Sequence, residues 1–420
     1  MRRRAFLAAA SAVFVLLIGC TEAPRRSSPT DSAALPPSSE SSPSASSPPA
    51  APERARLTIP GNGSFLLRIR YPSPSGRCVD PPKPVIRARY PGSLRVTRGD
   101  EGTLTVTVTL PFERYLEGIA EVPPTWPRAA LEAQAVAARS YALASTGWAG
   151  AQGETLDEPI CATSSCQVYE GIPVPPEPAH RRWVRAVRRT AGSVLLSGGR
   201  PADTVYFSTS NGRTYGNDEV FGSAPLPYLR PVVERDDGAS PSSRWRVRLP
   251  FHDLVRFLEA GDLWPGGRIA RASVDGDHVL FRGGGERRSI DVDDLRDAVN
   301  LWSDCLAPHR YPTDALPTTI PSRWLSVSVD RHRLVVTGRG WGHGVGMVQW
   351  GAYGKARRGL SADQILAYYY GGLTPQRYPE PGLIHVQVVT GAVGIRVTPS
   401  RSGAEVNGRP MEEPLVLGRR

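Results

Sequence analysis

Glu121 is the carboxyl residue whose surroundings best suit acid–base chemistry. It stands in GIAEVPP, after Leu116 and Ile119 and directly before the rigid run Val122-Pro123-Pro124. Apolar neighbours withdraw water from a carboxyl and raise its pKa from about 4.3 toward the value that a general acid needs near neutrality. Alternatively, Glu121 only complements the dipole of a following helix, which favours the carboxylate. Spacing alone favours this second interpretation.

Polar side chains that could hold a sugar occur in two nearby stretches. Arg139 interrupts the small, apolar run AVAARSYA, where an arginine either reaches solvent or pairs with a buried carboxylate or a ligand oxygen. The run YFSTSNGRT places hydroxyls and an amide around a glycine, which suits a glycan and equally a polar turn. The candidate sugar contacts in this run are Tyr206, Ser208, Ser210 and Asn211.

The segment Gly338–Gly354, GRGWGHGVGMVQWGAYG, combines seven glycines with aromatic and polar side chains. It has no GxGxxG spacing, and Gly354-Lys355 is followed by alanine, so it is not a phosphate loop. Alternating glycines permit positive φ or close backbone approach, while tryptophans offer flat faces to sugar rings. We therefore take Trp341, His343 and Gln349 as candidate sugar contacts, with Trp350 as a further stacking face. The alternative is a glycine-rich turn over core tryptophans with a satisfied histidine.

These residues need a mixed set of elements to position them. Strict alternation predicts a strand over Gly102–Leu110, and an alanine-rich helix is expected over Arg128–Ser145, with Thr125 as N-cap and Pro127 in the first turn. Further helices are expected at 182–190, 251–259, 292–301 and 361–370, and strands at 325–337 and 383–397. Helices and strands follow no βαβ rhythm, so the sequence favours an α+β fold.

The N-terminal segment is typical of export. Three arginines and a short apolar run end in LIGC, a lipobox-like sequence that predicts a signal peptide over residues 1–19 and lipidation of Cys20. An ordinary signal peptide with a chance cysteine is the alternative. Residues 20–55 are rich in Ser, Pro and Ala and are expected to form a disordered tether. The protein should then be extracytoplasmic and held at the membrane through this anchor.

Charge and cysteines support the same compartment. The net charge is +11, almost entirely from arginine, which favours anionic wall polymers or lipid headgroups as partners; no nucleic-acid-binding motif is present, so nucleic acid is discounted. Four cysteines follow Cys20, and an even number outside the cytoplasm favours disulfides. Cys161 and Cys166 are close enough to pair, which would leave Cys78 for Cys305.

Several long motifs in one order resemble the stage II sporulation protein D family, with its SpoIID/LytB-type domain. They are YLEG and EVP near Glu121, WP, AL, AQAVAARSYA, CQVYEG, the Tyr206–Thr214 run, LPYL, GWGHGVGMVQWGAYG and YYYG. The resemblance covers roughly residues 58–375. It implies one large SpoIID-like domain over 56–375, followed by a small β-rich tail over 376–420.

What the resemblance implies is a peptidoglycan lytic transglycosylase. Such an enzyme cleaves the MurNAc–GlcNAc β-1,4 bond and forms 1,6-anhydro-MurNAc; the family's catalytic glutamate falls on Glu121 and its helix arginine on Arg139. No cofactor is required for this chemistry. Two departures stand out: Glu132 replaces a common lysine, and Cys161 with Cys166 stand where some relatives bind zinc, so structural zinc is an alternative to a disulfide. The rival function is a non-catalytic wall-binding module that enhances a partner amidase.

Overall fold

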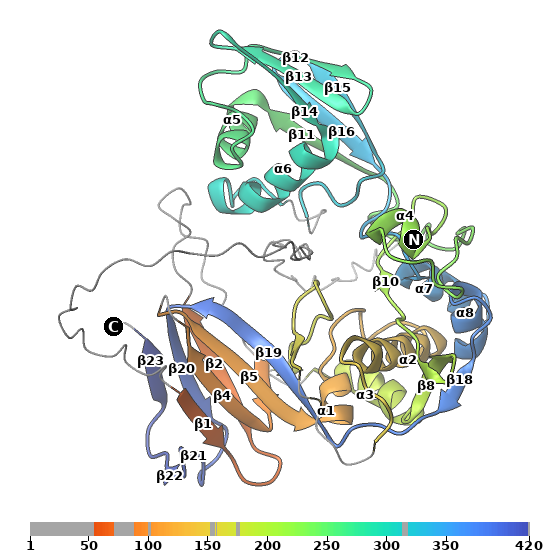
Figure 1. Ribbon diagram of the computed structural model, residues 1–420, viewed down its shortest axis with the longest axis vertical. Helices are drawn as coiled ribbons and strands as arrows, with labels where there is room; N and C mark the ends of the chain where they lie inside the picture. The colour runs from red at the N-terminus through yellow and green to blue at the C-terminus, as the bar shows by residue number, and fades with distance from the viewer. Residues whose placement is uncertain are drawn as a thin grey trace, which may run out of the picture.

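The computed structural model describes residues 54–70, 88–99, 102–151, 156, 158–173, 177–312 and 318–418. The expected signal segment, Cys20 and nearly all of the expected tether lie outside these residues. Within the described ranges, no helix combines the length and apolarity needed to cross a membrane. Helices and strands are interspersed along the chain, which confirms the α+β class (Figure 1).

Two sheets share the largest core of the molecule. The seven-stranded sheet has the order β22-β21-β1-β4-β5-β19-β6, and the five-stranded sheet the order β23-β20-β2-β3-β7. In β5 (Leu104–Pro111), every second side chain is buried, as its alternating sequence predicts. The other strands are β1 (Arg54–Thr58), β2 (Ser64–Arg70), β3 (Ala88–Pro91), β4 (Ser93–Arg98), β6 (Ile160–Cys161), β7 (Ile172–Pro173), β19 (Leu383–Ala392), β20 (Gly394–Pro399), β21 (Glu405–Val406), β22 (Arg409–Pro410) and β23 (Leu415–Gly418).

The C-terminal segment is part of this core rather than a small addition to it. β19 pairs antiparallel with β5 on one side and parallel with β6 on the other, so it lies inside the seven-stranded sheet. β20 pairs antiparallel with β2 and with β23, so it also lies inside its sheet. The expected single strand over 383–397 is thus two strands in two different sheets, separated at Val393.

A second layer is built around the helix α2 (Arg128–Ser145), at the lower right of Figure 1. The bounds of α2 are as predicted, but its N-cap is Pro127 and no side chain caps it, so Thr125 as N-cap was wrong. Its small face, Ala135, Ala138 and Ala142, is fully buried. The surrounding elements are α1 (Phe112–Glu117), α3 (His180–Arg189), α7 (Gln349–Arg357), α8 (Ala362–Tyr369), β8 (Ser193–Ser197), β9 (Arg200–Pro201) and β18 (Pro375–Arg377).

An inserted lobe with its own apolar core stands at the top of Figure 1. It interrupts the domain expected as one unit over 56–375. The segment 325–337, expected as one strand, is a hairpin that turns at Arg331, whose φ is +53°. The lobe comprises β11 (Trp245–Pro250), α5 (Phe251–Ala260), β12 (Arg271–Asp275), β13 (His278–Gly283), β14 (Glu286–Asp291), α6 (Val292–Leu306), β15 (Leu325–Asp330) and β16 (Arg333–Gly338).

The guanidinium of Arg139 joins the helical layer to the sheets. Its side chain is completely buried in α2, and its Nε and Nη2 atoms donate to Glu113 Oε1 at 3.0 and 2.8 Å. Nε also lies 2.7 Å from Glu380 Oε1, just before β19. Nη2 donates to the carbonyl of Val187 in α3, and Nη1 donates to Thr190 at the end of that helix. One side chain therefore holds α1, α2, α3 and the entry to β19 together.

Replacing Arg139 with leucine should destabilise the whole domain. The change leaves the Glu113 and Glu380 carboxyls without their buried cation, which costs about 3–5 kcal/mol of unfolding free energy. Urea denaturation followed by circular dichroism measures the loss. Arg246→Leu, at an exposed position of β11, is the control and should change stability by less than about 0.5 kcal/mol. An Arg139→Leu midpoint equal to that of the wild type would contradict this account.

Candidate active site

Glu121 is held by a short two-stranded ladder between residues 118–121 and 166–171. The Ala120 amide donates to the Val168 carbonyl at 2.9 Å, and the Glu170 amide to the Gly118 carbonyl at 3.0 Å. The ladder turns the Val168 N–H toward the acid, to whose Oε1 it donates at 2.7 Å. The donor to the carboxyl is thus a backbone N–H, whose position does not depend on the rotamer of Val168.

The loop that supplies this donor is anchored twice. Gln167 is fully buried; its amide donates to the Ala138 carbonyl in α2 at 2.8 Å, and its oxygen accepts from the Tyr115 hydroxyl at 3.3 Å. Cys161 and Cys166 close the base of the loop in a disulfide with a Cα–Cα distance of 5.5 Å. The loop therefore takes its position from α2 and from its own cross-link.

Cys161 and Cys166 form a disulfide, one of the two expectations for this pair. Zinc binds thiolates, and a sulfur in a disulfide is not one, so the described cysteine pair does not fit a zinc site. Cys305 is also disulfide-bonded, whereas Cys78, the partner expected for it, lies outside the described residues.

The polar run and the glycine-rich segment are brought together by parallel pairing. β10 (Tyr206–Phe207) pairs with β17 (Met347–Val348), and the Trp350 amide donates to the Ser208 carbonyl at 3.0 Å. Gly346 makes this approach feasible: its φ is +75°, and a Cβ there would lie 2.0 Å from the Val205 carbonyl oxygen. The loose backbone of the segment thus serves close backbone contact.

Three further side chains from separate elements surround the Glu121 carboxyl. Gln349, at the start of α7, places its amide nitrogen 3.5 Å from Glu121 Oε2 and 3.4 Å from the Glu121 carbonyl. The buried Tyr206 hydroxyl lies close enough to lower the pKa of Glu121, yet it makes no well-formed hydrogen bond with a described residue. Tyr141 of α2 packs edge-on against Tyr206, with ring centroids 6.4 Å apart.

Burial dominates the electrostatics of this cluster. Glu121 is half-buried, and removal of water raises its pKa to about 7, although the nearby Val168 amide, Gln349 amide and Tyr206 hydroxyl act to lower it. Glu121 lies seven positions before the first residue of α2, so it does not cap that helix. Burial likewise raises the pKa of Tyr141 to about 12, which keeps this phenol protonated. The site therefore offers a carboxyl that titrates near neutrality beside permanent O–H donors.

The other candidates in the polar run differ in their surroundings. Ser210 is buried, and both its amide and its hydroxyl donate to Asp237 Oδ2 at 2.8 Å, so it supports the fold and is not exposed to a ligand. Asn211 donates to the Tyr215 hydroxyl at 2.7 Å. Ser208 is half-buried, its hydroxyl 3.1 Å from that of Thr209, and it remains open to a ligand.

His343 does not offer a free nitrogen to a sugar. Its Nε2 bonds to the Tyr206 carbonyl at 2.9 Å, and its Nδ1 accepts from the Val345 amide at 3.2 Å. Burial lowers the pKa of the imidazole to about 4, so the ring is neutral near pH 7. Its two bonds fix it between the segments of Tyr206 and Val345. Trp341 is half-buried and forms a backbone bridge with Thr209, which leaves part of its indole accessible.

Arg139, expected as a sugar contact, and Glu132, which replaces a common lysine, both have partners within the protein. The side chain of Arg139 is completely buried and bonded to Glu113 and Glu380, so it is not exposed to a bound sugar and its role is structural. Glu132 lies between two arginines, 3.5 Å from Arg128 Nε and 3.7 Å from Arg189 Nη1. The carboxylate that replaces a lysine is therefore neutralised rather than left as a negative patch.

Sequence reasoning missed three contributors to the site. Tyr141 follows Arg139 in the alanine-rich helix, and Gln134 lies two turns earlier on the face of Tyr141, its oxygen 3.5 Å from the Gln349 amide. The third is the backbone N–H of Val168, in the motif CQVYEG. The polar residues on an otherwise small-residue helix were a usable signal for the first two, because each must satisfy its hydrogen bonds inside the core.

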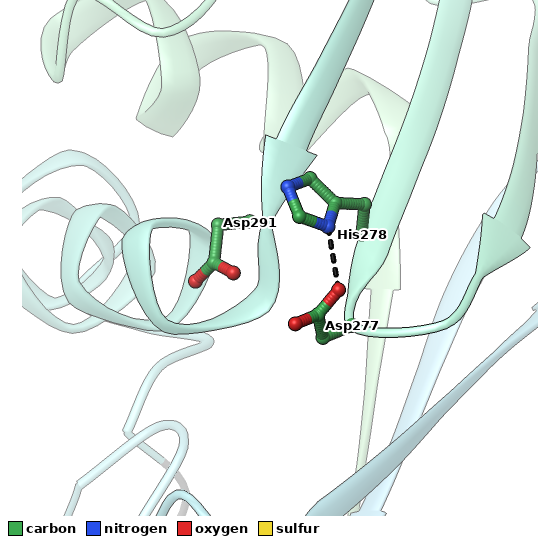
Figure 2. Close-up of side chains that lie close together, drawn as sticks. All are labelled: Asp277, His278 and Asp291. Carbon is green, nitrogen blue, oxygen red and sulfur yellow. Dashed lines mark hydrogen bonds and ion pairs between the residues drawn. The ribbon is translucent and has the colours of Figure 1, made fainter.

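A separate cluster lies on the inserted lobe, where Asp277, His278 and Asp291 approach one another (Figure 2). His278 Nδ1 bonds to Asp277 Oδ1 at 2.6 Å, which raises the pKa of the imidazole and favours its cationic form. Asp291 caps α6 by accepting from the amides of Asp293 and Asp294. Two cavities of about 470 and 460 Å³ flank this cluster, so neither belongs to the Glu121 site.

Glu121→Gln should stabilise the protein in a pH-dependent way. The pKa of Glu121 is raised from 4.5 to about 7 in the folded protein, so the unfolding free energy of the wild type falls as pH rises between these values. Glutamine does not titrate and causes no such fall. The variant should match the wild type near pH 4.5 and exceed it by about 1–3 kcal/mol above pH 7. Denaturation at a series of pH values tests this, and a constant difference across that range would exclude a desolvated Glu121.

Comparison with known proteins places the chain in a family. The family model described as "Stage II sporulation protein" matches residues 100–196, which include Glu121 and the loop of Val168. An uncharacterized protein of Brachyspira hyodysenteriae is 30% identical over 68% of this chain and 71% of its own length. Stage II sporulation protein D of Bacillus subtilis is 28% identical over 63% and 74%, and the amidase enhancer of the same organism 26% identical over 61% and 39%. The chain therefore belongs to the stage II sporulation protein D family.

Proposed function

We propose that this protein is a peptidoglycan lytic transglycosylase in which Glu121 is the general acid and base. The observation that carries the proposal is the Glu121 carboxyl, whose pKa burial raises to about 7. A carboxyl with this pKa holds a proton at neutral pH and can still release it, as a general acid must. A relative whose name is amidase enhancer supports action at the cell wall.

The chemistry needs one proton donor and an internal nucleophile. Glu121 protonates the glycosidic oxygen between MurNAc and GlcNAc while the bond from that oxygen to the anomeric carbon breaks. The C6 hydroxyl of the same MurNAc forms the new bond to the anomeric carbon, and the Glu121 carboxylate takes up its proton. The products are a 1,6-anhydro-MurNAc end and a GlcNAc end, and Glu121 is protonated again.

The surroundings of Glu121 fit a mechanism with one carboxyl. Hydrolytic glycosidases use two carboxyls about 5–9.5 Å apart. Among the groups that set the pKa of Glu121, no other described carboxylate appears. Asp218 and Glu219 lie on α4 (Asn217–Phe221), where Glu219 caps the helix and pairs with Arg213. An internal hydroxyl nucleophile makes a second carboxyl unnecessary.

The residues that would hold the glycan strand are those that keep unused surface near the acid. Tyr206 is partly exposed although its hydroxyl is buried near Glu121, and Ser208 and Trp341 are also partly exposed. The Gln349 amide reaches toward Glu121 at long distance and can turn to a sugar hydroxyl. Trp350 packs against Trp126 with centroids 4.9 Å apart and leaves part of its ring accessible for stacking.

The proposal includes a location. Peptidoglycan lies outside the cytoplasmic membrane, and the N-terminal sequence ending in LIGC provides export and a lipid on Cys20. Residues 20–55 would then link the anchor to the folded domain. No metal or cofactor takes part in the proposed steps.

Glu121→Gln should abolish formation of anhydro-MurNAc ends. Loss of the proton donor is expected to lower kcat by about 10²–10⁴-fold. Purified glycan strands, with and without stem peptides, are incubated with the protein and the ends identified by mass spectrometry. Glu219→Gln is the matched control and should retain activity, since that carboxylate is engaged on α4. Full activity of Glu121→Gln would refute the assignment.

A non-catalytic role is the second candidate, because one relative is named an amidase enhancer. In this case neither the wild type nor Glu121→Gln forms anhydro ends, and both raise the rate at which a purified cell-wall amidase releases stem peptides. If the wild type forms anhydro ends and Glu121→Gln does not, enhancement of an amidase is excluded as the sole function.

The rate should fall once as pH increases through about 7, because only the protonated carboxyl begins the reaction. Gln349→Leu should move this fall to higher pH, since loss of the amide removes a hydrogen bond that lowers the pKa of Glu121. The kcat/KM profile of wild type and variant measures both effects. A Gln349→Leu profile displaced to lower pH would contradict the assigned contact.

A further inference from the structure

The outer face of α3 carries the densest positive charge among the described helices. Of its ten residues, HRRWVRAVRR, five are arginines, and all five are exposed. At 100° per residue they fall within an arc of about 120° and extend about 12 Å along the helix. Trp183, Ala186 and Val187 occupy the opposite side and are buried against the rest of the molecule.

Part of this face is held in place by the body of the protein. Arg182 Nη2 donates to the Trp126 carbonyl at 3.0 Å, Arg188 Nε donates to Glu117 Oε1 at 2.9 Å, and Arg189 approaches Glu132 at 3.7 Å. Anchored guanidinium groups lose less side-chain entropy when they bind an anion, and their planar donors match phosphate and carboxylate groups.

The positive charge is not compensated locally. The arginines of α3, together with Arg128, contribute six charges against the carboxylates of Glu117 and Glu132. Adding Arg114, which also pairs with Glu117, and Glu177, which precedes the helix, leaves the balance of four positive charges unchanged. Arg181 and Arg185 are exposed and form no ion pair with any residue in the described ranges.

We propose that the exposed arginine face of α3 binds an anionic polymer with repeating phosphate or carboxylate groups, separately from the Glu121 site. A row of charges about 12 Å long suits a chain with an anion at each repeat, rather than one small ion. The face adjoins the candidate active site through Trp126, whose ring contacts Trp350 next to Gln349. Polymer binding here would concentrate the protein on its wall substrate.

A bilayer surface fits this helix less well. Interfacial helices place apolar side chains beside the basic ones and insert them among the lipids. On α3 the large apolar side chains point inward, and only the half-buried Val184 lies near the arginine face. The face therefore offers charge without an inserting group.

Binding of soluble polyanions tests the inference. The probes are a polyphosphate chain, polygalacturonate, neutral dextran, and vesicles with and without phosphatidylglycerol; fluorescence anisotropy or vesicle sedimentation gives the affinity of the full chain. Polyphosphate or polygalacturonate should bind, with a strong salt dependence, and Arg181→Gln/Arg185→Gln should bind roughly tenfold more weakly. The ratio between the two polymers tells phosphate from carboxylate recognition.

Arg246→Gln/Arg248→Gln removes the same charge from exposed positions of β11 and is the matched control. It should bind as the wild type does. Equal weakening by both double variants, no binding of either polyanion, or vesicle binding as tight as polymer binding would each overturn the inference. Glu121→Gln should bind polyanions normally, so the failure of this proposal and that of the catalytic proposal are distinguishable. Thermal unfolding confirms that each variant is folded.

Discussion

The hydrogen bond from the Val168 amide to the Glu121 carboxyl is the interaction on which the site depends. It holds the acid at one place while burial raises its pKa to about 7. A single backbone donor stabilises the carboxylate less than burial destabilises it, so the proton is retained near neutrality. The ladder of residues 118–121 with 166–171, the disulfide and Gln167 all act by fixing that amide.

Helix α2 provides the frame for this arrangement. Its small residues let neighbouring elements approach closely, and three of its polar side chains contact other elements. Gln134 faces Gln349, Tyr141 faces Tyr206, and Arg139 binds Glu113 and Glu380. A buried polar group that lacks a hydrogen-bond partner lowers the stability of the fold, so contacts of this kind are favoured in a tight core. The same helix therefore supports both the fold and the acid.

The arginine content of the chain acquires a location in the structure. Total charge indicated only that the protein suits anionic surroundings, whereas α3 collects five arginines on one exposed face. Glu132, which replaces a common lysine, lies between Arg128 and Arg189 and helps to hold their side chains in place. Catalysis at Glu121 and retention on the wall would then use neighbouring but separate surfaces.

The sequence by itself determined the local elements and marked Glu121 as a candidate acid. Alternation marked β5, alanine spacing marked α2 with its correct bounds, and apolar neighbours marked Glu121, because these signals arise between residues close in the chain. Only the tertiary structure decided what distant segments do to one another. It placed β19 inside the sheet, turned Arg139 from a sugar contact into a buried ion pair, and occupied both nitrogens of His343. The physical reason is that a polar side chain takes its role from its partner, and these partners come from segments that meet only in the folded chain.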